Sequence, residues 1–182
     1  MTPVTPRRIG FEELISVLIA EHVEIRKELA RLKKSVEGRE YSSAAEVLGE
    51  LDHLFRQHIA DEEAQVLHLL IDAYGVKGAD EAIVVFRQHR PIYQLMEQVK
   101  KLASLSPDEL ALNEASLKIM LEKHTEAEEN RVFPNALSAY KETWQIESLR
   151  RGFSATLNPP SFQEDIRSLL TVPQFKSAPE AP

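Results

Sequence analysis

Residues 58–67 read HIADEEAQVL and residues 124–133 read HTEAEENRVF, so one local pattern occurs twice in the chain. Each copy places a glutamate four residues after a histidine, His58 with Glu62 and His124 with Glu128. Residues four apart lie on one face of an α-helix, about 6 Å apart along its axis. If both copies are helical, each offers an imidazole nitrogen and a carboxylate oxygen to the same small volume.

Four stretches have apolar residues spaced three and four apart, which is the pattern of a helix with one buried face. The fourth opens with a capping box, Ser106-Pro107-Asp108-Glu109, and contains Pro134, which predicts a kink or break. The stretches run from about Phe11 to Val36, Ser42 to Tyr74, Ala79 to Ser104 and from Ser106 onward. Each buried row contains one histidine: His22, His58, His89 and His124.

Short turn signals separate these stretches, at Gly38, at residues 74–78 and at Ser106-Pro107. Connections this short join antiparallel neighbours. The sequence therefore predicts an all-α fold, an up-down-up-down antiparallel four-helix bundle over residues 1–150, with a C-terminal extension over residues 151–182. The extension holds five of the ten prolines and a short amphipathic stretch. We expect it to dock on the bundle, or to bind a protein partner or a second copy of the chain.

The positions of the turns give a further test of the bundle. In an antiparallel pair, two residues lie at the same height when the turn is midway between them. The midpoint of His22 and His58 is residue 40, beside Gly38. The other two midpoints, 73.5 and 106.5, fall on the second and third turns. The four histidines are therefore predicted to lie in one layer across the bundle.

Composition excludes several other classes of site. The chain has no cysteine, which rules out disulfides, thiolate nucleophiles, cysteine-bound zinc and iron–sulfur clusters. A net charge of -7 and a pI near 5.4 argue against nucleic acid or an anionic membrane as a partner. The longest apolar run, residues 14–20 with one serine, is too short to span a bilayer. With no recognisable signal peptide, a cytoplasmic location is expected.

A buried layer of four imidazoles and two carboxylates predicts bound metal. Without a cation, desolvation and repulsion between the two carboxylates would cost several kcal/mol. Metal binding turns the same groups into ligands. A mixed imidazole and carboxylate set suits six-coordinate iron or manganese, whereas zinc usually takes four ligands.

The order His, His-x-x-x-Glu, His, His-x-x-x-Glu resembles the hemerythrin or HHE cation-binding family over roughly residues 11–140. The resemblance implies a non-haem di-iron centre of two iron ions, completed by an oxo or hydroxo bridge. His22 and His58 would bind one iron, His89 and His124 the other, and Glu62 and Glu128 would bridge both. Each iron would then keep one open position, where oxygen, nitric oxide, peroxide or a related small ligand could bind.

Two positions depart from the patterns of that family. Oxygen-carrying members have a fifth histidine one turn after the third-helix histidine, where this chain has Tyr93. Some iron-sensing members have a carboxylate directly after the second histidine, where this chain has Ile59. Tyr93 could ligate iron as phenolate, hydrogen-bond to an iron-bound oxygen species, or pack in the core. Because the fifth histidine of the oxygen carriers is absent, the sequence does not by itself predict reversible oxygen carriage.

Four other polar residues near the pattern have simpler interpretations. His53 and His68 fall off the buried stripe of their helix, so we expect them on the surface. Glu63 and Glu129 directly follow the two candidate glutamate ligands. They are expected at the flank of the site, either solvated or hydrogen-bonded to the histidines.

The sequence leaves three functions open. The first is a binding protein that takes up oxygen or a related ligand for sensing, storage or scavenging. The second is a di-iron oxidoreductase that decomposes peroxide, reduces nitric oxide or oxidises ferrous iron. The third is an iron-responsive regulatory module. Enzyme activity stays undecided, because no separate general base, nucleophile or cofactor motif is visible.

Overall fold

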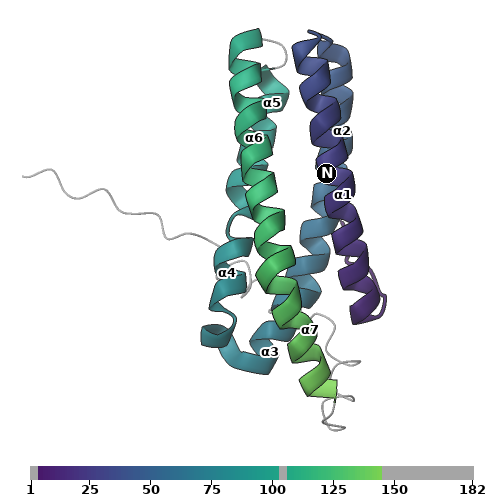
Figure 1. Cartoon of the computed structure of the whole chain (residues 1–182), viewed down its shortest axis with the longest axis vertical. Helices are drawn as coiled ribbons and strands as arrows, with labels where there is room; N and C mark the ends of the chain where they lie inside the picture. The colour runs from purple at the N-terminus through teal and green to yellow at the C-terminus, as the bar shows by residue number, and fades with distance from the viewer. Residues whose placement is uncertain (1–3, 103–105, 145–182) are drawn as a thin grey trace, which may run out of the picture.

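The computed structural model describes residues 4–102 and 106–144. Within these residues every regular element is helical, and the helices pack antiparallel as four rods, which confirms the predicted fold class (Figure 1). The first rod is α1 (Phe11–Glu37). The second contains α2 (Tyr41–Asp61), η1 (Glu62–Val66) and α3 (Leu67–Gly78). The third contains α4 (Asp80–Phe86) and α5 (His89–Leu102), and the fourth α6 (Pro107–Ala127), η2 (Glu128–Val132) and α7 (Phe133–Trp144).

Sequential neighbours pack side by side, as expected for short connections. α1 contacts α2 and α6, while α5 contacts α6 and α2, which closes the ring of four helices. The Ser106 hydroxyl accepts the backbone N–H of Glu109 at 3.5 Å, so the predicted capping residue lies at the start of α6. Gly75 has φ +69° inside α3, a conformation that favours glycine, and it lies within the predicted turn at 74–78.

The irregularities of the helices differ in place from those predicted. Pro134 does not break the fourth rod, because α7 runs through it from Phe133 to Trp144. The irregular turn comes earlier, in η2, where the Phe133 N–H bonds the Glu128 carbonyl five residues back. This is a π-helical turn, and η1 makes the same one with no proline following. The third rod has a break at Arg87–Gln88 that was not predicted.

The apolar interior consists of two separate clusters, one toward each end of the bundle. One is built around Leu14, Leu18 and Phe86, and the other around Leu29, Leu51 and Leu121. The histidine-bearing layer lies between them. The buried residues of both clusters are at most 8% exposed, so the layer is enclosed by apolar side chains above and below.

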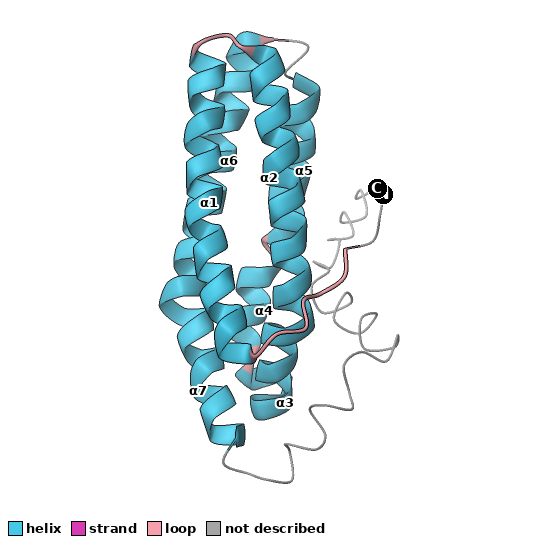
Figure 2. Ribbon diagram, turned by 90° about the vertical axis from the view of Figure 1, so that its right-hand side faces the viewer, coloured by secondary structure: helices cyan, strands magenta, loops and turns pink. Residues whose placement is uncertain are grey.

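Residues 4–10 run back along α2 as an extended segment, which is the long pink loop that leads into α1 in Figure 2. The backbone N–H of Arg7 donates to Asp61 Oδ1 at 2.6 Å, and Gln65 donates to the Arg7 carbonyl at 2.8 Å. No described helix is both long enough and apolar enough to cross a membrane. The expected extension, residues 151–182, lies outside the described residues, and so does the end of the bundle domain beyond residue 144.

Candidate metal centre

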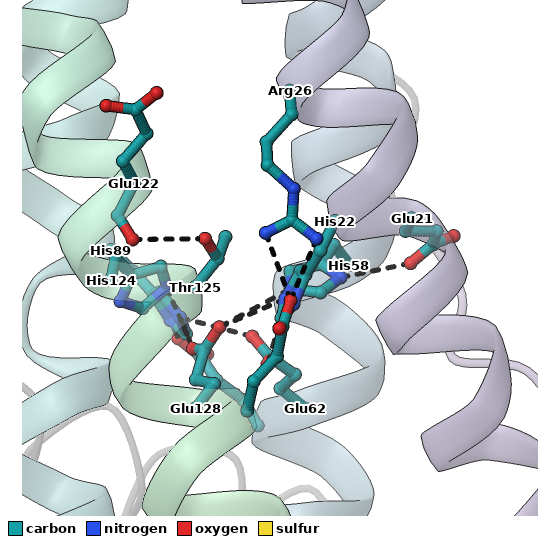
Figure 3. A network of polar contacts seen from close by, with 12 residues as sticks. Glu21, His22, Arg26, His58, Glu62, His89, Glu122, His124, Thr125 and Glu128 are labelled. Atoms are coloured by element: carbon teal, nitrogen blue, oxygen red, sulfur yellow. Dashed lines mark hydrogen bonds and ion pairs between the residues drawn. The ribbon is translucent and has the colours of Figure 1, made fainter.

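Six buried side chains from all four rods meet in the layer between the two apolar clusters (Figure 3). Two groups of four have ligand atoms within 4.8 Å of one another. The first contains His22 and His58 and the second His89 and His124, and both include Glu62 and Glu128. All six residues that the sequence predicted as ligands are thus brought together.

The two glutamates lie between the two pairs of histidines. Glu62 places Oε1 3.3 Å from His58 Nε2 and Oε2 3.3 Å from His89 Nε2. Glu128 places Oε2 3.2 Å from His22 Nε2 and Oε1 2.9 Å from His124 Nε2. Each carboxylate therefore directs one oxygen at each pair, which is the arrangement a bridging carboxylate requires.

The chemistry of these inner atoms fits metal ions better than hydrogen bonds. Both oxygens of Glu62 and Glu128 are buried without a hydrogen-bond partner among the described residues, and so are His89 Nε2 and His124 Nε2. His22 Nε2 and His58 Nε2 lie 3.1 Å apart, a contact that requires a proton on one of them when no cation is bound. Buried polar atoms are normally paired. A cation coordinated by these atoms would give each of them a partner and would separate the two facing nitrogens by a shared positive charge.

The spacing of the donors is also suitable for coordination. Metal bonds of about 2.1 Å place neighbouring ligands roughly 3.0–3.4 Å apart, depending on geometry. Five distances within the cluster lie between 2.9 and 3.3 Å. One joins two histidine nitrogens, and the other four join a histidine nitrogen to a glutamate oxygen. The buried cluster is therefore suited to a di-metal site.

Electrostatics keep the two glutamates ionised. Burial raises the pKa of Glu128, but His124, His22 and His58 outweigh that effect and hold it well below its usual value. Burial lowers the pKa of His58, but Glu62 and the other carboxylates raise it well above normal. The pKa of His89 is raised in the same way, so without metal the protons on His58 and His89 balance the buried carboxylates. Metal ions would replace those protons.

The outer ring nitrogens of three histidines are paired with further carboxylates. His22 Nδ1 lies 2.8 Å from Glu129 Oε1, and His89 Nδ1 lies 2.9 Å from Glu63 Oε1. This confirms the predicted flanking position of Glu63 and Glu129, in the hydrogen-bonded form. Such contacts fix the tautomer and direct Nε2 toward the layer.

A third carboxylate, Glu21, was not predicted from the sequence. Its Oε2 lies 3.0 Å from His58 Nδ1, and the side chain is 9% exposed. Arg7 pairs with the other oxygen of Glu21. Burial raises the pKa of Glu21, but its hydrogen bonds with His58 and Arg7 lower it overall. The position of Glu21 directly before His22 does not predict this contact, because Glu21 reaches a histidine on a different helix.

The π-helical turns explain how two consecutive glutamates serve one histidine. Glu62 and Glu63 contact opposite nitrogens of His89, and Glu128 and Glu129 contact opposite nitrogens of His22. Successive residues of an α-helix differ by about 100° in direction, which would separate such a pair. η1 and η2 begin at these glutamates, and their wider turns reduce that separation.

Aromatic rings cover the layer on both sides. Phe55 lies 6.1–6.4 Å, between ring centroids, from His58, His89 and His124. Phe133 stacks on His22 at 5.6 Å, and Phe86 stacks on His89 at 5.1 Å. These phenylalanines are at most 1% exposed, so they exclude water and restrict the rotation of the imidazoles.

The other residues that the sequence singled out have contacts outside the six-residue cluster. Tyr93 stacks on Phe55 at 6.3 Å and lies under Arg56, whose guanidinium carbon is 4.4 Å from the ring centroid. Burial and the nearby Asp52 raise the pKa of its phenol, which disfavours phenolate. His53 is exposed, and His68 is partly exposed with Nε2 3.0 Å from Asp72, in agreement with the predicted surface positions.

Replacing Tyr93 with phenylalanine should therefore leave both the metal content and the visible absorption of the protein unchanged. The hydroxyl is removed, but the stacking on Phe55 is retained. Absorption spectra of the iron-loaded variant and the parent protein measure this directly. Disappearance of a long-wavelength band in the variant would mean that the phenolate ligates iron.

The family model for the hemerythrin HHE cation binding domain matches residues 3–70. This stretch includes His22, His58 and Glu62, so the resemblance seen in the sequence is confirmed for this part of the chain. No curated protein and no solved structure matches the chain. His89, His124 and Glu128 lie beyond the matched residues, and the geometry joins them to the same buried cluster.

Proposed function

We propose that this hemerythrin-like chain holds two iron ions and binds oxygen, nitric oxide or peroxide there, for sensing, storage or scavenging. His22 and His58 would hold one ion, His89 and His124 the other, with Glu62 and Glu128 shared between them. The observation that carries the proposal is the position of the two glutamates, each with one oxygen facing each histidine pair. Two irons held this way supply redox-active metal with coordination positions left for a small ligand.

The donor set favours iron over zinc. Each group offers two imidazoles and two carboxylates, and both carboxylates are shared. A structural zinc site is usually complete with four tetrahedral ligands of its own. Shared carboxylates and room for further ligands suit a pair of six-coordinate ions.

The surroundings favour a small ligand. Phe55, Phe86 and Phe133 cover the layer, and no ligand side chain is more than 6% exposed. An organic substrate would need to displace one of these rings. A diatomic molecule or peroxide requires far less space.

Iron analysis of the purified protein tests the proposal, and two irons per chain are expected. His58→Ala should lower the iron content, because it removes an inner nitrogen. His53→Ala is the matched control, since it removes an exposed histidine from the same helix. An iron content below one per chain in protein reconstituted anaerobically with ferrous iron would overturn the proposal.

Ligand addition to the anaerobic reduced protein separates binding from turnover. A ligand-induced visible spectrum that reverses when oxygen or nitric oxide is removed is the expected result. Steady consumption of peroxide or nitric oxide would favour the oxidoreductase. An iron-dependent change in proteolysis with no ligand spectrum would favour the regulatory module.

A further inference from the structure

The outer hydrogen bonds of the cluster follow the internal repeat of the sequence. His22 and His89 begin the two corresponding hairpins, and each has its Nδ1 on the glutamate that follows a bridging glutamate. The distances are 2.8 Å for His22 to Glu129 and 2.9 Å for His89 to Glu63. To this extent the two candidate metal positions are equivalent.

The equivalence fails at the other two histidines. His58 Nδ1 lies 3.0 Å from Glu21, the residue before His22. The corresponding residue before His89 is Gln88, which carries no charge. His124 is the counterpart of His58, and its Nδ1 is buried with no hydrogen-bond partner among the described residues. Among the residues that the structure describes, one imidazole of the second candidate metal position, at His89 and His124, therefore has no carboxylate to orient it.

At the first candidate metal position, that of His22 and His58, two arginines hold the carboxylates that orient the histidines. Both terminal nitrogens of Arg26 lie 3.1 Å from Glu129 Oε1. Arg7 pairs with Glu21 and is itself fixed by Asp61. Within residues 4–102 and 106–144, Glu63 makes no ion pair with a lysine or arginine. The orienting carboxylates of the first position are thus fixed in place, and within the described part of the chain the one in the second position is held only by its histidine.

We propose that the two positions differ in affinity, so that the position at His22 and His58 fills first and the position at His89 and His124 fills second. Glu21, held by Arg7, is a positioning residue for the first. This inference rests on the proposed di-iron function. A carboxylate on the outer nitrogen fixes the ring and increases the basicity of the inner nitrogen. Loss of such a partner typically weakens metal affinity about 10–100-fold.

Calorimetric titration of the metal-free protein with ferrous iron alone, without oxygen, tests the order of filling. Two steps are expected, with the first at least tenfold tighter. His124→Ala should leave one ion bound at about the affinity of the first step, and His58→Ala one ion at about that of the second. Two equal steps, or the opposite assignment, would overturn the inference but leave the di-iron proposal intact. No binding in the parent protein would overturn both.

The assigned cause can be tested by removing the carboxylate at residue 21 and by adding one at the corresponding residue 88. Glu21→Gln should weaken the first step about 10–100-fold with little change in the second. Gln88→Glu should tighten the second step, because residue 88 corresponds in the internal repeat to Glu21, which is the carboxylate partner of His58. Glu24→Gln is the matched control, since it makes the same change at an exposed site on α1. A second step unchanged by Gln88→Glu would refute the assigned cause.

The contribution of Arg7 to the affinity of the first step can be measured by comparing substitutions at two adjacent arginines. Arg7→Gln should weaken the first step, because Glu21 then loses its second partner. Arg8→Gln is the control, because Arg8 is the exposed neighbour in the same segment. Equal effects of both variants would mean that general charge, and not the contact with Glu21, sets the affinity.

Discussion

Replacing Glu128 with alanine should remove both metal ions, the largest effect expected from a single side chain in this protein. Its two oxygens lie within 3.9 Å of the inner nitrogens of all four histidines. Removal of an outer partner costs about 10–100-fold in affinity. Loss of a ligand shared by both ions should therefore weaken each position by more than about 100-fold. Iron content should fall from two per chain to near zero.

The second glutamate provides a graded comparison. Glu62 contacts only His58 and His89 among the four histidines, so Glu62→Ala should retain more iron than Glu128→Ala. Glu128→Gln preserves the size of the side chain and removes its charge, and it should behave like the alanine variant. Glu126→Ala is the control on the exposed side of α6. Iron retained equally in the Glu62 and Glu128 variants would contradict the special position of Glu128.

The bundle and its ligand layer could be predicted because helical geometry is local and regular. The spacing from His58 to Glu62 fixes both side chains on one face. Short turns fix which helices are neighbours. The midpoints between histidines then determine the heights of His22, His89 and His124. No step required knowledge of side-chain packing.

The features that were missed depend on contacts between helices or on departures from α-helical geometry. Glu21 reaches a histidine on another helix, and no spacing rule connects residues 21 and 58. The π-helical turns at Glu62 and Glu128 have no propensity signal, and Pro134 was wrongly given the irregularity that belongs to η2. The break before His89 was missed because apolar spacing continues across it. None of these misses changes which residues meet in the layer.

Metal binding should also dominate the stability of the bundle. The layer divides the interior into two apolar clusters. Several of its buried imidazole and carboxylate atoms have no hydrogen bond to any residue that the structure describes. A ligand present at 1,000 times its dissociation constant stabilises a protein by about 4 kcal/mol. Two such sites would contribute about 8 kcal/mol, which raises Tm by roughly 15–30 °C for a chain of this size.

Thermal unfolding followed by circular dichroism, with and without ferrous iron under anaerobic conditions, measures this shift. The shift requires that iron binds the folded bundle far better than the unfolded chain, where the four histidines are dispersed in sequence. His53→Ala should show the full shift, because that histidine is exposed and outside the layer. Glu128→Ala should show almost none. If two irons are bound but Tm does not rise, the ions cannot be held by this buried layer, since ligands assembled only by folding must couple binding to stability.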